Sequence, residues 1–179
     1  MFKNKLLAIT LTSLLSACAS TTPTSTKDAL SAITITNDKF NNSTTIETPL
    51  YLSRKGFTDT FPVQLKYRAN YQDSKRQFIQ LYITISGGDW GFYNRASGED
   101  GSSLELVKID NLVGSTSGIV ITKEHVGLLI PMSYLSSMSA ADFSIKLYGK
   151  RRSGDFVVPS SLSKAFMKKL NCFEANTCS

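Results

Sequence analysis

The residues that could carry chemistry are few, and His125 is the only histidine in the chain. One histidine rules out sites built on several histidines, including those of the usual zinc enzymes. A Ser-His-Asp triad needs only one, but the sequence has no G-x-S-x-G elbow to supply its nucleophile. The segment 123–126 is typical of a strand end or a turn, so we interpret His125 as a surface or half-buried side chain.

Carboxylates are the second possible source of chemistry, because a pair about 5–10 Å apart can hydrolyse glycosides. The acids that could form such a pair are Asp89, Glu99, Asp100, Glu105 and Asp110. Glu99 and Asp100 lie in an expected turn, where solvated acids are ordinary. The sequence also lacks a Walker loop, a dinucleotide fingerprint and an EF-hand loop. We therefore predict a protein that is not an enzyme, with no catalytic residue, no metal and no cofactor.

The most distinctive segment is a glycine-rich stretch over residues 87–93. It holds the only tryptophan, Trp90, together with Phe92 and Tyr93. A bend that presents aromatic faces could bind a sugar ring or a hydrophobic partner. The alternative, which we prefer, is that Trp90 fills the core while the glycines allow a β-bulge.

A basic run, Lys150-Arg151-Arg152, follows an expected strand and precedes a glycine turn. Together with the lysines of residues 164–169 it could form a patch for phospholipid or lipopolysaccharide phosphates. We prefer the simpler interpretation, a solvated hairpin end.

The N-terminus has the three parts of an export signal. Lys3 and Lys5 precede an apolar stretch that is too short for a membrane-spanning helix, and Leu15-Ser16-Ala17-Cys18 follows. This tetrapeptide resembles the lipobox of bacterial lipoproteins. The resemblance implies a signal peptide over residues 1–17, diacylglycerol on the thiol of Cys18, cleavage before Cys18, and acylation of the new amine, often by palmitate. Two or three acyl chains hold a protein on a membrane, since each buried methylene contributes about 0.8 kcal/mol.

The residue after the lipidated cysteine bears on localisation. Ala19 stands there instead of aspartate. In the lipoprotein class this resembles the default that sends a protein to the outer membrane. We therefore expect this protein to be anchored in the outer membrane by lipid and to face the periplasm. Exposure on the cell surface stays open.

Removal of residues 1–17 shortens the chain from 179 to 162 residues, the size of one domain. The mature chain then has 18 Lys and Arg and 14 Asp and Glu, so its formal charge is +4. This charge is compatible with weak attraction to anionic lipids and gives no reason to expect a nucleic-acid partner. We predict a lipidated flexible tether over residues 18–29 and a single β-rich domain over residues 30–179.

Two further cysteines, Cys172 and Cys178, lie near the C-terminus. Exported thiols meet an oxidising compartment, so we predict that they form a disulfide. A six-residue separation gives a stabilisation of only about 2 kcal/mol, and its expected role is to hold the C-terminal tail.

The sequence indicates a mainly β chain. Segments 63–71 and 78–86 alternate apolar and polar residues, and the polar turn 72–76 between them predicts a long antiparallel hairpin. Segment 111–118 is expected to be a loop. Further short strands are expected at 32–36, 91–96, 104–110, 119–122, 126–130, 143–148 and 156–158.

Two helices interrupt this pattern. Pro131 predicts a short helix to Met138, and Ser160 or Ser161 could cap a second helix to Leu170. Its apolar stripe is Leu162, Ala165, Phe166 and Leu170. Many short strands with turns between them favour an antiparallel β-sandwich or an open barrel, with the C-terminal helix packed on the sheet.

Three short segments, 80–83, 89–93 and 146–150, resemble small bacterial envelope proteins to which no activity is assigned. That resemblance carries no functional residue to this chain. We expect a lipid-anchored, non-enzymatic envelope protein that serves as a protein-interaction or accessory module, with another envelope protein as its partner. The alternative is a glycan- or lipid-binding module centred on Trp90.

Overall fold

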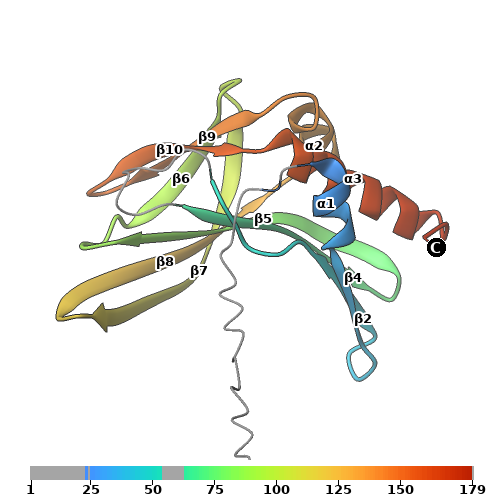
Figure 1. The fold of residues 1–179 in the computed structure, drawn as a ribbon, viewed down its shortest axis with the longest axis horizontal. Coiled ribbons are helices and arrows are strands. Elements are labelled where there is room, and N and C mark those ends of the chain that lie inside the picture. The colour runs from blue at the N-terminus through green and yellow to red at the C-terminus, as the bar shows by residue number, and fades with distance from the viewer. Residues whose placement is uncertain (1–22, 24, 54–62, 179) are drawn as a thin grey trace, which may run out of the picture.

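The structure is a computed structural model, and it describes residues 23, 25–53 and 63–178 (Figure 1). The chain is mainly β, and its antiparallel sheet curls into a half-barrel with short helices beside it. The predicted fold class is therefore confirmed, in its open-barrel form. Figure 1 shows α1, α2 and α3 grouped on one side of the molecule, while the β7–β8 hairpin projects on the other.

The helices are α1 (Thr26–Ser31), α2 (Met132–Met138) and α3 (Ser160–Glu174). The strands are β1 (Thr34–Asp38), β2 (Ser43–Glu47), β3 (Tyr51–Leu52), β4 (Gln64–Gln72), β5 (Lys75–Gly87), β6 (Tyr93–Gly98), β7 (Ser103–Thr116), β8 (Ile119–Leu129), β9 (Phe143–Gly149) and β10 (Ser153–Val158). Their order in the sheet is β1-β2-β4-β5-β8-β7-β6-β9-β10, with β3 beside β4.

The predicted long hairpin is confirmed as β4 and β5. Side chains of β4 alternate between buried and half-buried positions along its whole length, as a half-covered strand requires. The connection is tighter than expected, because Gln72 already pairs with Lys75. The two residues between them, Asp73 and Ser74, both have positive φ, which matches the twist of a two-residue hairpin turn.

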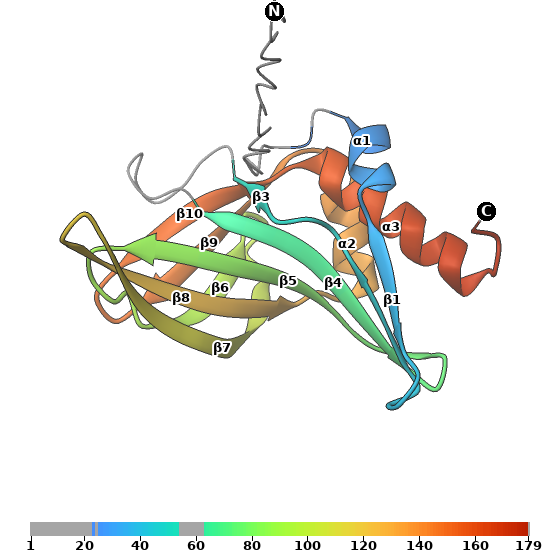
Figure 2. The ribbon, with the colours of Figure 1, turned by 60° about the horizontal axis from the view of Figure 1, so that its bottom comes forward.

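The core lies between the inner face of the sheet and α3, which crosses the sheet beside α1 and α2 (Figure 2). The predicted apolar stripe of α3 is fully buried. At its centre the Phe166 ring stacks on Tyr67 of β4, with ring centroids 5.1 Å apart. The Tyr67 hydroxyl shares a hydrogen bond with Ser163 Oγ at 3.1 Å, so the buried phenol is satisfied inside the core.

The start of α3 differs from the prediction of a serine cap. The cap residue is Pro159, and its side chain accepts no hydrogen bond. The Ser160 N–H instead donates to Asp142 Oδ1 at 2.9 Å, so a distant carboxylate satisfies this free amide. The helix also continues to Glu174, whose Oε1 binds Arg76 Nη1 at 2.6 Å.

The predicted loop over residues 111–118 was wrong. β7 runs through this segment to Thr116, and residues 119–129 form one strand, β8, rather than two. The two strands pair in register out to Thr116 and Ile119, and Ser117 and Gly118 make the turn, both with positive φ. The result is a long hairpin whose outer part, residues 112–121, we call the arm.

The folded part begins earlier than the sequence predicts. Residues 26–29, assigned to the tether, belong to α1, which Ser25 caps by accepting a hydrogen bond from the Asp28 N–H. Ala29 is fully buried in the core, so this short helix packs instead of staying solvated. Cys18 and the signal lie outside the described residues. No helix in the described part of the chain is long and apolar enough to cross a membrane.

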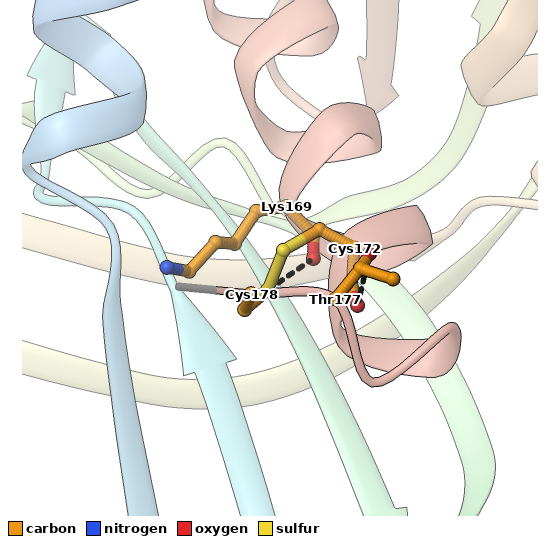
Figure 3. The surroundings of a disulfide bond; sticks show 4 residues. All are labelled: Lys169, Cys172, Thr177 and Cys178. Atoms are coloured by element: carbon orange, nitrogen blue, oxygen red, sulfur yellow. Dashed lines mark hydrogen bonds between the residues drawn. A yellow bond between two sulfur atoms is a disulfide. The ribbon is translucent and has the colours of Figure 1, made fainter.

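Two contacts secure the ends of the fold. After β3, the Ser53 hydroxyl donates to the Val157 carbonyl (2.9 Å) and accepts from the Val157 N–H (3.0 Å), which links it to the edge strand β10. At the C-terminus, Cys172 and Cys178 form the predicted disulfide, with Cα atoms 5.1 Å apart. Figure 3 shows the tail folding back over the last turn of α3, beside Lys169.

Candidate functional site

The two segments that the sequence marks separately, the Trp90 bend and the basic run, lie against each other. The Lys150 N–H donates to the Phe92 carbonyl at 3.3 Å, and the Arg151 N–H donates to the Gly91 carbonyl at 3.2 Å. The Arg151 guanidinium carbon lies 5.6 Å from the centre of the Phe92 ring, within the range of a cation–π contact. We call Trp90, Phe92 and Arg151 the aromatic–arginine cluster.

The three aromatic residues of the bend have different environments. Tyr93 begins β6 and is buried in the core, with 1% of its surface exposed. Trp90 is only half-buried, so its interpretation as the core residue was wrong. Phe92 is 38% exposed, and its ring centre lies 6.5 Å from that of Trp90. Two neighbouring rings therefore face solvent together, while the third anchors the bend.

Two side chains of strand β8 fix the bend through hydrogen bonds to its backbone. The buried carboxylate of Glu124 accepts hydrogen bonds from the Gly91 N–H and, at 3.3 Å, from the Tyr93 N–H. The Thr122 hydroxyl donates to the Gly87 carbonyl at 2.9 Å. The hydrogen bonds to the Glu124 carboxylate are charge-assisted, and such bonds are about twice as strong as neutral ones. Both ends of the bend are therefore fixed by one strand.

Phe92 has an unusual backbone conformation, with φ of 55°. A non-glycine residue in this left-handed region costs of order 1–3 kcal/mol and persists only where its surroundings impose it. The surroundings here are backbone contacts that need a glycine at residue 149. A Cβ at Gly149 would lie 2.3 Å from the Gly91 carbonyl oxygen. The fold thus accepts local strain while it leaves the Phe92 ring exposed.

The basic run divides into exposed and half-buried members. Lys150 and Arg151 are exposed, whereas Arg152 is half-buried beside Gly87, where a Cβ would lie 2.5 Å from its Nη1. Burial raises the pKa of the Tyr93 phenol well above its usual range, the Arg152 charge opposes this, and the Glu124 charge reinforces it. Arg152 therefore supports the bend, and Lys150 and Arg151 are the exposed cations of this run.

His125 lies within β8 and not at a strand end or a turn. Its Nδ1 is 2.6 Å from Tyr82 Oη and 3.1 Å from Thr84 Oγ1. Burial lowers the pKa of His125, the Lys123 charge adds to this, and the Asp110 charge opposes it. The imidazole is half-buried, in agreement with one of the two environments that we expected.

Two of the acids that were candidates for a hydrolytic pair, Glu99 and Asp100, make hydrogen bonds at the turn after β6. Glu99 Oε2 accepts from the Ser144 N–H at 2.8 Å, and Asp100 accepts from the N–H and hydroxyl of Ser102, as expected of acids that organise a turn. Hydrogen bonds to Ser102 lower the pKa of Asp100. No group of three or more metal-ligating side chains occurs among the described residues.

The arm is the feature that sequence reasoning missed. Apolar side chains are exposed along it and at its base: Val107, Ile109, Leu112, Val113, Ile119 and Val120. Leu112 and Val113 are adjacent in β7, as Ile119 and Val120 are in β8, so both faces of the arm present apolar groups. The last pair between β5 and β8 is Gly87 with Thr122, so β5 does not pair with the arm beyond that point.

Comparisons of the chain with protein-family models, with curated proteins and with solved structures gave no match.

Proposed function

We propose that this protein is a lipid-anchored, non-enzymatic envelope protein whose arm docks on a protein partner. The observation that carries the proposal is the exposure of large aliphatic side chains on both faces of the arm, up to 66% for Val113 and 62% for Ile119. Scattered exposed apolar residues are ordinary, but a continuous apolar projection marks an interaction surface.

The backbone of the arm adds a second reason to expect a protein. β6 pairs with β7 only through Ala96 and Ser97, and β5 ends at Gly87, so the outer edges of both arm strands have no neighbouring strand in the described chain. Free N–H and C=O groups on such edges can add a strand from another protein. Residues 111–120 also contain no charged side chain. We expect a partner with an apolar groove that ends in an open strand edge.

The position of the expected anchor agrees with this arrangement. The Ser161 hydroxyl donates to the Pro23 carbonyl at 3.4 Å, which fixes the start of the described chain on α3. In both ribbon views α1 and α3 lie on the side of the molecule away from the tip of the arm (Figures 1 and 2). A lipid on Cys18 would hold the helical side near the membrane and leave the arm available.

The test is photo-crosslinking in cells. Benzoylphenylalanine placed at Val113 or Ile119 should capture one protein near stoichiometry, and the Val120→Ser substitution should weaken that capture. The matched control position is Phe40, which is fully exposed in the β1–β2 turn. The same products from Phe40, or crosslinks to lipid alone, would rule out a protein-docking arm.

The aromatic–arginine cluster supports a second candidate function, a glycan- or lipid-binding module. The strained backbone of Phe92 favours this function because it fixes an exposed ring beside Trp90 and Arg151. Trp90 is the only tryptophan, so its fluorescence reports on this cluster alone. A saturable emission shift with envelope glycans or lipids that Phe92→Ala abolishes would support the module, and no shift with either ligand class would eliminate it.

A further inference from the structure

The outer face of the sheet, opposite α3, carries a pocket of about 560 Å³ that lies outside the aromatic–arginine cluster. Its side chains come from five neighbouring strands, β2, β4, β5, β8 and β7, and from the segment 48–50. Lys66 and Arg68 alternate in β4 with buried core residues, and Lys66 pairs with Tyr82 of β5. His125 of β8 completes the row beside Thr84. Polar and basic groups are thus gathered by strand register from distant parts of the chain.

Tyr82 is the centre of this cluster. The Lys66 Nζ lies 5.6 Å from the Tyr82 ring centre, and the Arg68 guanidinium carbon lies 5.0 Å from it. The Tyr82 hydroxyl is 2.6 Å from His125 Nδ1. Cations that rest on an aromatic ring keep their charge and lose some of their water, which prepares them for an anionic ligand.

The charge of the pocket is unbalanced. Lys66 forms a salt bridge with Glu47 at 2.7 Å, which neutralises one cation. Within the described part of the chain, no carboxylate forms an ion pair with Arg68 or Lys123, and both line the pocket. The lining therefore contains three cations and one carboxylate, which favours an anion.

The Arg68 side chain is also held in place. Its Nε donates to Gln80 Oε1 at 2.7 Å. Gln80 can lie there because residue 127 is glycine, since a Cβ at Gly127 would meet the Gln80 amide at 2.3 Å. With Nε engaged, the two terminal nitrogens of the guanidinium remain for a ligand. That pair matches the spacing of two oxygens of a phosphate.

Two further features suggest what the ligand looks like. The His125 Nε2 is buried and has no hydrogen-bond partner among the described residues, a polar atom that an acceptor at the pocket floor would satisfy. Leu50, Ile109 and Leu112 line the same pocket, and the last two are exposed. The site therefore joins cations to an apolar rim at the base of the arm.

We propose that this pocket binds the phosphate group of an anionic amphiphile, with Arg68 and Lys123 on the phosphate and Ile109 and Leu112 along its apolar part. Lipid headgroups and free phosphate share the chemistry of the charged group. The proposal shares Leu112 with the arm, but its charged part does not depend on the partner of the arm, because Arg68 and Lys123 lie outside the arm on β4 and β8.

The test uses the full chain purified in a non-ionic detergent. His125 is the only histidine, so its imidazole NMR signals report on this pocket without assignment of other residues. We expect dihexanoyl phosphatidic acid to shift these signals saturably and to raise the pKa of His125, because a bound anion favours the imidazolium. The other charged groups near the ring, Lys123 and Asp110, change the baseline but not the dependence on ligand.

Matched variants separate the outcomes. Arg68→Gln and Lys123→Gln should each weaken binding at least tenfold, whereas Lys75→Gln, an exposed lysine at the start of β5, should leave it unchanged. Saturable binding of inorganic phosphate at similar strength also supports the anion site and identifies free phosphate as its source. Equal binding of dihexanoyl phosphatidylcholine, equal loss in Lys75→Gln, or no shift with any probe would overturn the proposal.

Discussion

The exposed Phe92 ring depends on residues that are inconspicuous in the sequence. Glu124 holds the amides of the bend, and Gly149 lets the bend approach the β9–β10 turn closely. Neither contact is local, because Glu124 lies more than thirty residues from Gly91 and Tyr93. At the residue scale, long-range contacts to the backbone of the bend therefore fix the positions of Trp90 and Phe92.

A substitution at Gly149 tests this dependence. In Gly149→Ala the new Cβ would collide with the Gly91 carbonyl oxygen, so the bend must move. Overpacking of this kind costs about 1–3 kcal/mol, and we expect that loss in the free energy of unfolding measured with urea. The control is Gly114→Ala, where nothing lies within 4 Å of the added Cβ. Equal stability of the two variants would show that the bend is not fixed by this contact.

The pH dependence of stability gives a prediction for His125. Burial lowers the pKa of its folded state below the ordinary value of 6.5, so the unfolded chain binds this proton more readily. The stability contributed by neutral His125 is complete above pH 6.5 and is lost as the pH falls through the folded pKa. Urea unfolding at pH 7.5 and about pH 5 should therefore show a smaller loss in His125→Gln than in the parent protein. An equal loss of unfolding free energy in the parent protein and in His125→Gln would contradict a lowered pKa of His125 in the folded state.

The residue types of the site could be predicted from the sequence, but their neighbours could not. Trp90, Phe92 and Arg151 stand out by type and composition. Their contact could not be foreseen, because it depends on where β5 ends and where β9 turns. The environments of Trp90 and Tyr93 have a similar cause, because Trp90 lies in the bend between β5 and β6 whereas Tyr93 is the first residue of β6.

At the scale of elements, alternation in the sequence predicted the β4–β5 hairpin, and apolar residues at helical spacing predicted the stripe of α3. Alternation is the signal that matters for the arm. It failed for the arm because Leu112, Val113, Ile119 and Val120 occur in adjacent pairs, which removes the period of two. The glycines and serines between these pairs are typical of a loop. An exposed strand without a buried face has no alternation to detect, so the element most relevant to binding is the hardest to predict.

Shortening the arm tests whether it is needed for folding. Replacement of Gly114–Ile121 by Asn-Gly keeps the pair Val113–Thr122 and closes it with a two-residue turn. Because Ile119 and Val120 are exposed and Ile121 is only half-buried, we expect the free energy of unfolding to change by less than about 1 kcal/mol. Crosslinking to the partner from Val113, which the shortened hairpin retains, should disappear. A large loss of stability would mean that the arm belongs to the folding core.

At the scale of the whole molecule, the helices and the arm lie on different sides of a rigid half-barrel (Figure 1). The Ser53–Val157 contact adds a link between the segment after β3 and the edge strand β10. Under the proposed function, this arrangement would place the arm away from the anchored side and leave it accessible to a partner.

The lipid anchor gives the last prediction. The thiol of Cys18 is the expected acceptor of diacylglycerol, and a serine hydroxyl is a far weaker nucleophile. In Cys18→Ser we expect no palmitate labelling, no cleavage after residue 17 in the intact mass, and loss of the lipid-dependent membrane fraction. The control, Cys172→Ser, should still be labelled, cleaved and bound to the membrane. From Cys18 to Pro23 the chain reaches about 18 Å at most, so the anchor would hold α3 close to the headgroups. Continued palmitate labelling of Cys18→Ser would contradict a lipid anchor at Cys18. The reason to place the arm away from the membrane would then be lost as well.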